Sequence, residues 1–401
     1  MKSFATVARK PPVDWSSSFY KCGVAVALSW SLLGCTASQV SSTVPSTDAG
    51  NGHSPSGVIS AGVRWVGRVD ASDPKAIKFA WSGSGFVATV TGSAVAVRLR
   101  SDGAGDAVFF QPIVDGVAGE RFSISPADGE KSVVLASALP DGDHRVELVR
   151  ETEGKPGFPS SVFLGFAAGT PKAPPAFSGR LIEIVGDSIS AGYGNLGSEQ
   201  HPNYGPDPGG GCHFSTETES ASKSYGMVAA RTLGADASIL AASGWGIYSD
   251  NGGNRSNVLP TLYARTLGGQ ASPEWDFWLK PQAVVINLGT NDFSANMNLG
   301  AEEFTGAYRA FVAKVRGNYP DAFVYCALSP MLYGSGLDNA RKYINDLVSK
   351  LNESGDKKIR VLDFGQQNIS LGTGCDYHPS VIEHQRLAEL LVNQLRADFG
   401  W

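Results

Sequence analysis

A serine that directly follows an apolar run is the first residue in this sequence whose position suggests chemistry. The run Leu181–Val185 ends in Gly186-Asp187-Ser188, and small residues follow. A serine hydroxyl is a weak nucleophile at neutral pH and needs a base within hydrogen-bond reach. Gly-Asp-Ser also occurs in ordinary turns, so the rest of the chain must supply that base and donors for a developing oxyanion.

His378 is the best candidate for the base among six histidines. It lies in the loop GCDYHPS before the last expected helix, whose start is specified by the capping-box spacing of Ser380 and Glu383. His384 shares a helical face with apolar residues and is expected to pack there. A loop between the last strand and the last helix reaches the same sheet edge as Ser188, so we expect His378 to act as the base.

Two other expected strand ends supply oxyanion donors. Asn291 follows AVVINL, and Gly244 follows ASILAA. The Asn291 side-chain amide, the Gly244 N–H and the Ser188 N–H together would form a three-donor oxyanion hole. Trp245 is the one aromatic residue for which we predict substrate contact, because sugars stack on such rings, although aromatic residues at strand ends commonly pack.

Strands alternate with amphipathic helices from residue 180 onward. The strands are LIEIV, ASILAA, AVVINL, AFVYCAL and IRVLDF, and helices are expected near 223–233, 302–319, 337–351 and from 381. This alternation predicts an α/β domain over residues 177–401, with a parallel sheet covered on both faces. In such sheets ligands bind at the carboxyl ends of the strands, where Ser188 lies.

Residues 58–172 show strand periodicity without a convincing helix, as in AVAVRLR at 94–100. Asp-Gly pairs, which favour tight hairpins, recur every thirteen residues at Asp102, Asp115, Asp128 and Asp141. The pattern predicts a β-sandwich of jelly-roll type, with a structural or a sugar-contacting role. The proline-rich segment 171–175 marks the linker to the next domain.

Residues 1–35 are typical of an export signal. Basic residues precede the apolar run Gly23–Leu33, which is too short to span a bilayer comfortably. The run leads into LLGC, which resembles a bacterial lipobox and predicts lipidation of Cys35; the alternative is a plain secreted protein. Residues 36–57, rich in Ser, Thr and Gly, are expected to form a flexible tether. We therefore expect a protein exported to the bacterial envelope, attached to the membrane only through the lipid, or secreted.

The net charge and the cysteine content bear on nucleic-acid binding, disulfide formation and metal binding. A net charge of −5 and a pI near 5.7 give no indication of the positive charge that nucleic-acid binding requires. Cys326 is expected to be a buried thiol, whereas Cys212 and Cys375 lie on loops near the site and either form a disulfide or stay reduced. A zinc site from His201, Cys212 and His213 lacks paired ligand spacing, so no metal is expected.

The order GDS, a glycine block, GTND and a C-terminal histidine block resembles the SGNH (GDSL) hydrolase superfamily. The segments RWVGRVD, FAWSGSGFVATVTG, CHFSTETE, INLGTNDFS and GCDYHPS are similar to those of the acetyl esterases of carbohydrate esterase family two, over about residues 60–400. The resemblance implies a jelly roll followed by an SGNH domain. It also implies that Ser188 is the nucleophile, that Gly244 and Asn291 complete the oxyanion hole, and that His378 is the base.

One position departs from the superfamily pattern. The superfamily places an acid three residues before the histidine, where this chain has Cys375, and Asp376 lies only two before. Either the loop bends so that Asp376 orients His378, or a backbone carbonyl does so in a Ser–His dyad. We expect Asp376 to be the orienting acid.

The leading hypothesis is a monomeric serine esterase that removes acetyl groups from a polysaccharide such as xylan, through an acetyl-enzyme on Ser188 and without any cofactor. One alternative is that the same catalytic residues hydrolyse a different ester, so that the protein is a lipase, a thioesterase or an envelope deacetylase. Another is a lipid-anchored carbohydrate-binding protein with a degenerate hydrolase domain. An α/β-hydrolase fits less well, because its nucleophile elbow requires glycine where this chain has Ser190.

Overall fold

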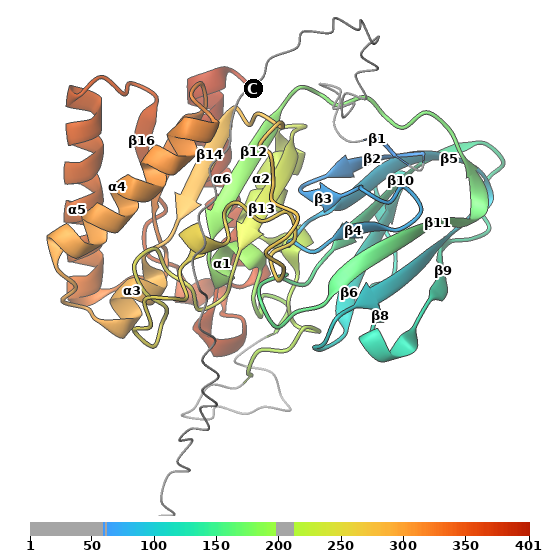
Figure 1. Cartoon of the computed structure of the whole chain (residues 1–401), viewed down its shortest axis with the longest axis horizontal. Coiled ribbons are helices and arrows are strands. Elements are labelled where there is room, and N and C mark those ends of the chain that lie inside the picture. Colours follow the sequence, from blue (N-terminus) through green and yellow to red (C-terminus); the bar gives the residue numbers. More distant parts are fainter. Residues whose placement is uncertain (1–58, 61, 198–211) are drawn as a thin grey trace, which may run out of the picture. The chain divides into compact units, whose positions relative to one another are not determined.

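The computed structural model describes residues 59–60, 62–197 and 212–401. The predicted lipidation site Cys35, the tether after it and His201 lie outside these ranges. Strands β1–β11 make up the first part of the described chain, and alternating strands and helices make up the second (Figure 1). In the described ranges, no helix combines the length and the apolar character needed to cross a membrane.

The first part is an antiparallel β-sandwich built around one long strand, β5 (Gly85–Asp102). The first half of β5 pairs with β2 (Val63–Val66) and β10 (Asp143–Arg150), and the second half pairs with β9 (Lys131–Ala136). Strand β11 (Ser160–Pro171) pairs with β5 from Asp102 back to Val90, with register shifts on the way. The shorter strands are β1 (Ile59–Ser60), β3 (Val69–Asp70), β4 (Ile77–Phe79), β6 (Val108–Val114), β7 (Val117–Ala118) and β8 (Phe122–Ile124). Apolar residues from both halves of β5 fill one core, which explains the alternating pattern of the sequence.

The second part is a five-stranded parallel sheet in the order β13-β12-β14-β15-β16. Its strands are β12 (Leu181–Gly186), β13 (Asp236–Ala241), β14 (Ala283–Asn287), β15 (Phe323–Leu328) and β16 (Ile359–Asp363). Strands β12 and β14 are buried along their whole length. A parallel sheet with both faces covered requires such continuous apolar strands.

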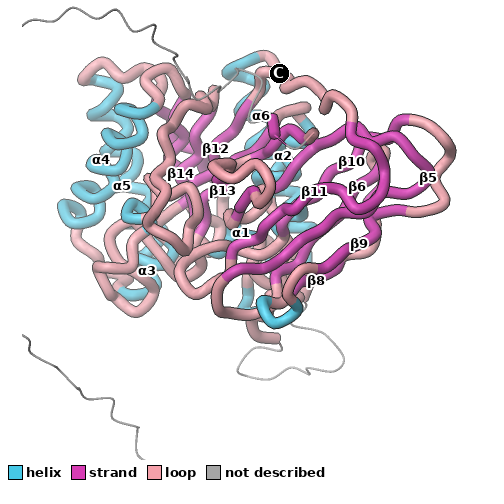
Figure 2. Tube along the Cα trace, turned by 45° about the vertical axis from the view of Figure 1, so that its right-hand side comes forward, coloured by secondary structure: helices cyan, strands magenta, loops and turns pink. Residues whose placement is uncertain are grey.

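Two pairs of helices cover the faces of this sheet (Figures 1 and 2). Helices α4 (Ala301–Asn318) and α5 (Gly334–Glu353) share one apolar cluster with the sheet, and α2 (Tyr225–Thr232) and α6 (Val381–Phe399) share the other. The four helices expected from the periodicity are therefore present. Two short helices that the periodicity did not predict, α1 (Ser188–Ala191) and α3 (Thr290–Ala295), follow β12 and β14.

Two arginines of the β-sandwich reach the parallel sheet. Arg68, only 1% exposed, donates to a Glu183 carboxylate oxygen at 3.2 Å and to the Tyr263 carbonyl at 2.5 Å. Arg64 forms an ion pair with Asp236, the first residue of β13. Because buried charges are stable only when paired, these contacts join the two parts of the described chain in a defined way.

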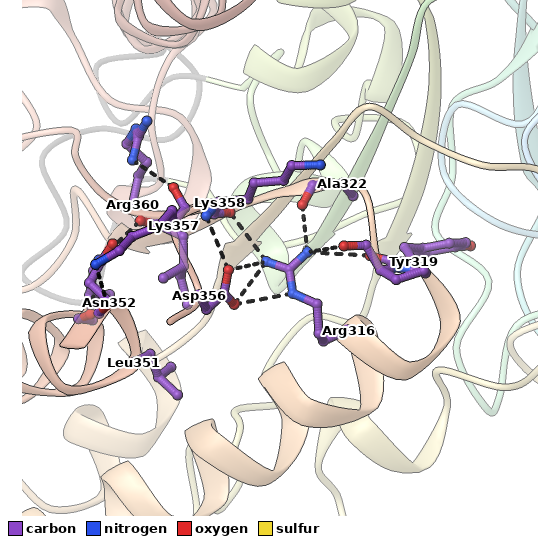
Figure 3. A network of polar contacts seen from close by, with 12 residues as sticks. Arg316, Tyr319, Ala322, Leu351, Asn352, Asp356, Lys357, Lys358 and Arg360 are labelled. Atoms are coloured by element: carbon purple, nitrogen blue, oxygen red, sulfur yellow. Dashed lines mark hydrogen bonds and ion pairs between the residues drawn. The ribbon is translucent and has the colours of Figure 1, made fainter. Parts of the chain in front are cut away.

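A charged network holds the amino ends of β15 and β16 (Figure 3). Arg316, in the last turn of α4, donates to both oxygens of Asp356 at 3.0–3.1 Å. The same guanidinium donates to the carbonyls of Ala322 at 2.6 Å and Lys358 at 3.2 Å, the residues just before the two strands. Because the guanidinium carries several donors in a fixed plane, Arg316 connects the end of α4 to the residues just before β15 and β16.

Candidate active site

Ser188 lies in the first turn of α1, directly beyond β12. The carboxylate of Asp187 caps this helix by accepting the Ile189 N–H at 3.1 Å. Ser188 Oγ lies 2.8 Å from His378 Nε2, and the two residues are 190 positions apart in the sequence. The structure thus brings the predicted nucleophile and the predicted base within hydrogen-bond distance.

Backbone carbonyls orient the imidazole of His378. Its Nδ1 lies 3.2 Å from the carbonyl oxygen of Cys375 and 3.1 Å from that of Asp376. A proton on Nδ1 satisfies these acceptors and leaves Nε2 unprotonated toward Ser188. The contact with the carbonyls favours the tautomer that a general base requires.

The expectation that the Asp376 carboxylate orients His378 is wrong. Asp376 and Tyr377 have left-handed backbone angles, with φ of 51° and 59°, and this tight turn presents carbonyls to the ring. The carboxylate instead accepts hydrogen bonds from Tyr193 Oη at 2.6 Å, His213 Nδ1 at 2.8 Å and the Phe214 N–H at 3.0 Å.

These bonds determine the ionisation of Asp376. Burial works to raise the pKa of Asp376, but the hydrogen bonds from Tyr193, His213 and the Phe214 N–H outweigh burial and lower it. The ionised carboxylate therefore anchors residues 213 and 214 against the turn that carries His378. Asp376 supports the geometry of the site through this loop.

A disulfide joins Cys212 to Cys375, as one of the two sequence hypotheses expected. Cys375 is also the residue whose carbonyl faces His378, and its N–H donates to the Gly194 carbonyl at 3.0 Å. The bridge therefore holds the turn before His378 from one side. Cys326 is buried and unbridged, as predicted, and burial raises the pKa of its thiol to about 12.

A row of aromatic rings continues from the imidazole. The Tyr193 ring stands 4.2 Å from that of His378, and Phe214 stacks on Tyr193 at 4.6 Å. Phe158, from the β-sandwich, meets Phe214 edge to face at 6.3 Å. We did not predict a role for these rings from the sequence; the position of Tyr193 five residues after Ser188 was the available signal.

The predicted oxyanion donors follow the strands on either side of β12. In register, Gly186 of β12 pairs with Ala241 of β13 and Asn287 of β14, so the three strands end at one level. Gly244 and Asn291 therefore leave the sheet at the same edge as Ser188. This is the convergence that the motif order predicted.

Gly244 and Asn291 are held in different ways. Asn291 Nδ2 lies 3.0 Å from the Trp245 carbonyl oxygen and 3.5 Å from an Asp187 carboxylate oxygen. Gly244 has a φ of +81° in a turn closed by the Trp245 N–H on the Ala242 carbonyl at 3.1 Å. In the described part of the chain the Gly244 N–H has no hydrogen-bond partner. It is therefore available to a ligand oxygen.

Two buried aspartates stabilise the loops at this edge. Asp292 accepts the backbone N–H groups of residues 247–249, and burial raises its pKa although these hydrogen bonds oppose the shift. Burial, reinforced by the negative charge of Asp292, raises the pKa of Asp187 to about 7. Burial thus brings the pKa of the residue beside Ser188, the predicted nucleophile, close to neutral pH.

The remaining predicted residues lie as follows. Trp245 is half-buried and packs against the apolar cluster under α4 and α5, which leaves part of its ring for a ligand. His384 is fully buried, and its Nδ1 accepts the Tyr225 N–H at 3.2 Å. Burial lowers the pKa of His384 to about 3, so it is a neutral packing histidine, as expected.

Family models match both parts of the chain. The model described as carbohydrate esterase 2 N-terminal matches residues 65–175, and the GDSL-like Lipase/Acylhydrolase family matches residues 184–386. A family two carbohydrate esterase from Clostridium thermocellum, solved in complex with cellohexaose, superposes with a TM-score of 0.77 at 37% identity, over 84% of this chain and 99% of that one. The chain belongs to carbohydrate esterase family two.

Relatives of known activity are similar to this family two chain along most of its length. A cellulase/esterase from Acetivibrio thermocellus is 38% identical over 85% of this chain, but the match spans only 40% of that relative's length. An acetylxylan esterase / glucomannan deacetylase from Cellvibrio japonicus is 28% identical over 82% of this chain and 88% of its own length. The family resemblance inferred from the motifs is therefore confirmed.

Proposed function

We propose that this chain is a serine esterase that removes O-acetyl groups from a polysaccharide. The observation that carries the proposal is the 2.8 Å contact between Ser188 Oγ and His378 Nε2, at the sheet edge that also presents Gly244 and Asn291. The names of the family two relatives support the same chemistry.

In the proposed reaction, Ser188 Oγ attacks the acetyl carbonyl while His378 Nε2 takes its proton. The negative charge that develops on oxygen is met by the N–H groups of Ser188 and Gly244 and by the Asn291 amide. Collapse of this intermediate expels the sugar hydroxyl, which receives the proton from His378. Water then attacks the acetyl-enzyme, with His378 as the base, and releases acetate.

Two backbone carbonyls contribute to the orientation of the imidazole in this proposal. The contacts of Nδ1 include two neutral carbonyls, and a carbonyl stabilises an imidazolium less than a full negative charge does. The contacts still fix the tautomer and the direction of the ring. Orientation of the imidazole is therefore the main contribution of the turn at 375–377.

We propose xylan or glucomannan as the acetylated polymer, because the Cellvibrio relatives carry the names acetylxylan esterase and glucomannan deacetylase. The cellohexaose complex of the Clostridium esterase supports a β-linked sugar chain as the kind of ligand. The half-buried ring of Trp245, next to Gly244, is our candidate for stacking on a sugar.

The test is acetate release from acetylated xylan and glucomannan by the wild type and by Ser188→Ala. The variant should lose about a thousandfold or more of its kcat, because the nucleophile is gone, while its thermal unfolding should be unchanged. Esters of longer acyl chains should react more slowly than acetyl esters. Faster turnover of long-chain esters would instead support the lipase alternative, and an active Ser188→Ala variant would contradict the mechanism.

We also propose that the chain is exported, lipidated on Cys35 and monomeric. The support is the basic and apolar pattern of residues 1–35 and its LLGC end. Labelling with radioactive palmitate in a bacterial host should mark the wild type and leave Cys35→Ala unlabelled. Gel filtration of the region from residue 58 onward should give the volume of a single chain.

A further inference from the structure

We propose that the β-sandwich helps to build the oxyanion hole: Lys155, with Glu153, holds the Ser243–Gly244 peptide so that the Gly244 N–H faces the acyl oxygen. This inference rests on the proposed esterase function. It assigns a positioning role to two residues that belong to the other part of the chain.

The contacts form a clamp around one residue. Lys155 Nζ donates to the Ser243 carbonyl oxygen at 2.6 Å, and a Glu153 carboxylate oxygen accepts the Ser243 N–H at 2.7 Å. The other oxygen of Glu153 lies 3.4 Å from Lys155 Nζ. Both polar backbone groups of Ser243 are therefore held by an ion pair from the β-sandwich, and the Glu153 side chain is only 1% exposed.

The clamp determines where the Gly244 N–H points. In a trans peptide the C=O and the following N–H point in opposite directions, so a carbonyl of Ser243 held toward Lys155 directs the Gly244 N–H away from it. The φ of +81° at Gly244, in a turn closed from Ala242 to Trp245, is typical of a type II turn. A type I turn would flip this peptide and withdraw the N–H from the hole. The hydrogen bond from Lys155 favours the productive orientation.

The positive charge of Lys155 also strengthens the Gly244 N–H as a hydrogen-bond donor. A charged donor on a carbonyl makes a hydrogen bond roughly twice as strong as a neutral donor does. It also polarises the peptide group, which makes the N–H on the other side a better donor. Lys155 therefore acts on the acyl oxygen through Gly244, without touching the substrate.

The segment that carries the clamp is itself rigid. The fully buried guanidinium of Arg150 donates to the carbonyls of Thr152 at 2.8 Å, Glu153 at 3.0 Å and Pro159 at 2.9 Å. Burial lowers the pKa of Arg150 to about 9, which still leaves it charged at neutral pH. A carboxylate oxygen of Glu219 accepts the Glu153 N–H at 3.2 Å. A residue from the second part of the chain therefore also fixes the backbone of Glu153.

A second carboxylate, that of Glu219, lies next to the clamp. Burial, followed by the negative charge of Glu153, raises the pKa of Glu219 well above its ordinary value.

Three variants test the inference. Lys155→Met keeps the aliphatic stem and removes the charge, Lys155→Arg keeps a charged donor, and Lys172→Met is a matched control, because Lys172 forms an exposed ion pair with Asp143 on the same β-sandwich. Two quantities are measured on each: kcat/KM for 4-nitrophenyl acetate, and the inhibition constant of a boronic acid that forms a tetrahedral adduct with Ser188. Titration of Ser188 with a fluorophosphonate expresses all rates per active site.

Lys155→Met should lower kcat/KM by about 10- to 100-fold, a smaller loss than deletion of a direct oxyanion donor, and should weaken the boronic acid by the same factor. Lys155→Arg should recover most of the loss, and Lys172→Met should match the wild type. Equal losses in the Met and Arg variants, a loss of kcat/KM without weaker boronate binding, or a Lys155→Met enzyme as active as Lys172→Met would each overturn the inference. A wild type that hydrolyses no acetyl ester would instead refute the proposed function.

Discussion

Two groups of charged residues at opposite ends of the parallel sheet are partnered in opposite ways. At the amino ends, Arg316 is neutralised by Asp356 and its remaining donors meet carbonyls. At the carboxyl ends, Asp187 and Asp292 are buried, and in the described part of the chain their hydrogen-bond donors are N–H and hydroxyl groups rather than cations. The charged network at the amino end stabilises the fold. The two buried carboxylates at the carboxyl end cost free energy of folding, and they hold the backbone of the site in place.

This contrast explains why the two ends should respond differently to substitution. A paired network loses free energy of folding when one partner is removed. A buried carboxylate without a cation can lose its charge with a gain in stability, because the desolvation cost disappears. Removing a charged partner at the amino end should therefore cost stability and leave the rate of acetyl transfer unchanged, whereas removing the charge of Asp187 at the carboxyl end should raise stability.

The largest effect is expected from the disulfide at the carboxyl end. Cys212→Ser opens a bridge between residues 163 positions apart, for which the chain-entropy model gives a loss of up to about 5 kcal/mol in the free energy of unfolding. The value of kcat should fall as well, because Cys375 presents its carbonyl to His378. Urea unfolding and acetyl esterase assays check both. Cys326→Ala, on β15 and outside the bridge, should leave kcat unchanged; an equal loss of kcat in both variants would contradict this role of the bridge.

Asp187→Asn should change how stability depends on pH. Burial raises the pKa of Asp187 from 3.8 to about 7, so the folded state binds a proton more tightly than the unfolded state does. Wild-type stability should therefore fall as the pH rises from about 4 to about 7, by at most about 4 kcal/mol from this group. Asparagine keeps the helix cap and cannot ionise. Urea titrations at pH 5 and 8 should show a stability difference in favour of the variant that grows with pH; a constant difference would contradict the assignment.

Arg316→Met should lower the free energy of unfolding by about 2 kcal/mol, because the partly exposed Asp356 and four carbonyls lose their shared donor. The value of kcat per active site should stay at the wild-type level. Denaturant unfolding and active-site titration measure the two effects separately. A large loss of kcat in the folded variant would show that the two ends of the sheet are not independent.

Asp376→Asn should lower the rate only slightly, because the carbonyls and not the carboxylate contact His378. We expect kcat to fall less than about tenfold, against the loss of about 10⁴ typical when the acid of a true triad is replaced by its amide. The pH dependence of kcat/KM between pH 5 and 9 should keep the wild-type shape. A loss of kcat as large as that seen when a triad acid is replaced would show that the Asp376 carboxylate orients His378.

The sequence allowed the strands, the helices and the Ser188–His378 pair to be predicted, because each depends on a local pattern and on the rule that parallel strands end at one edge. The orienting group of His378 could not be predicted, since it depends on left-handed backbone at Asp376 and Tyr377, residue types that adopt this conformation only in a particular tertiary setting. The contacts of Glu153 and Lys155 with Ser243 join the two parts of the chain, and no pattern within either part reveals them.

The most direct test of the account is the capture of the acetyl-enzyme. The protein is mixed with an excess of 4-nitrophenyl acetate, quenched with acid within milliseconds, digested and analysed by mass spectrometry. The account predicts one acetyl group on the peptide that contains Ser188, absent from Ser188→Ala and strongly reduced in His378→Ala. Turnover by the wild type with no acetyl group on Ser188 at any quench time, or with the group on another residue, would contradict it.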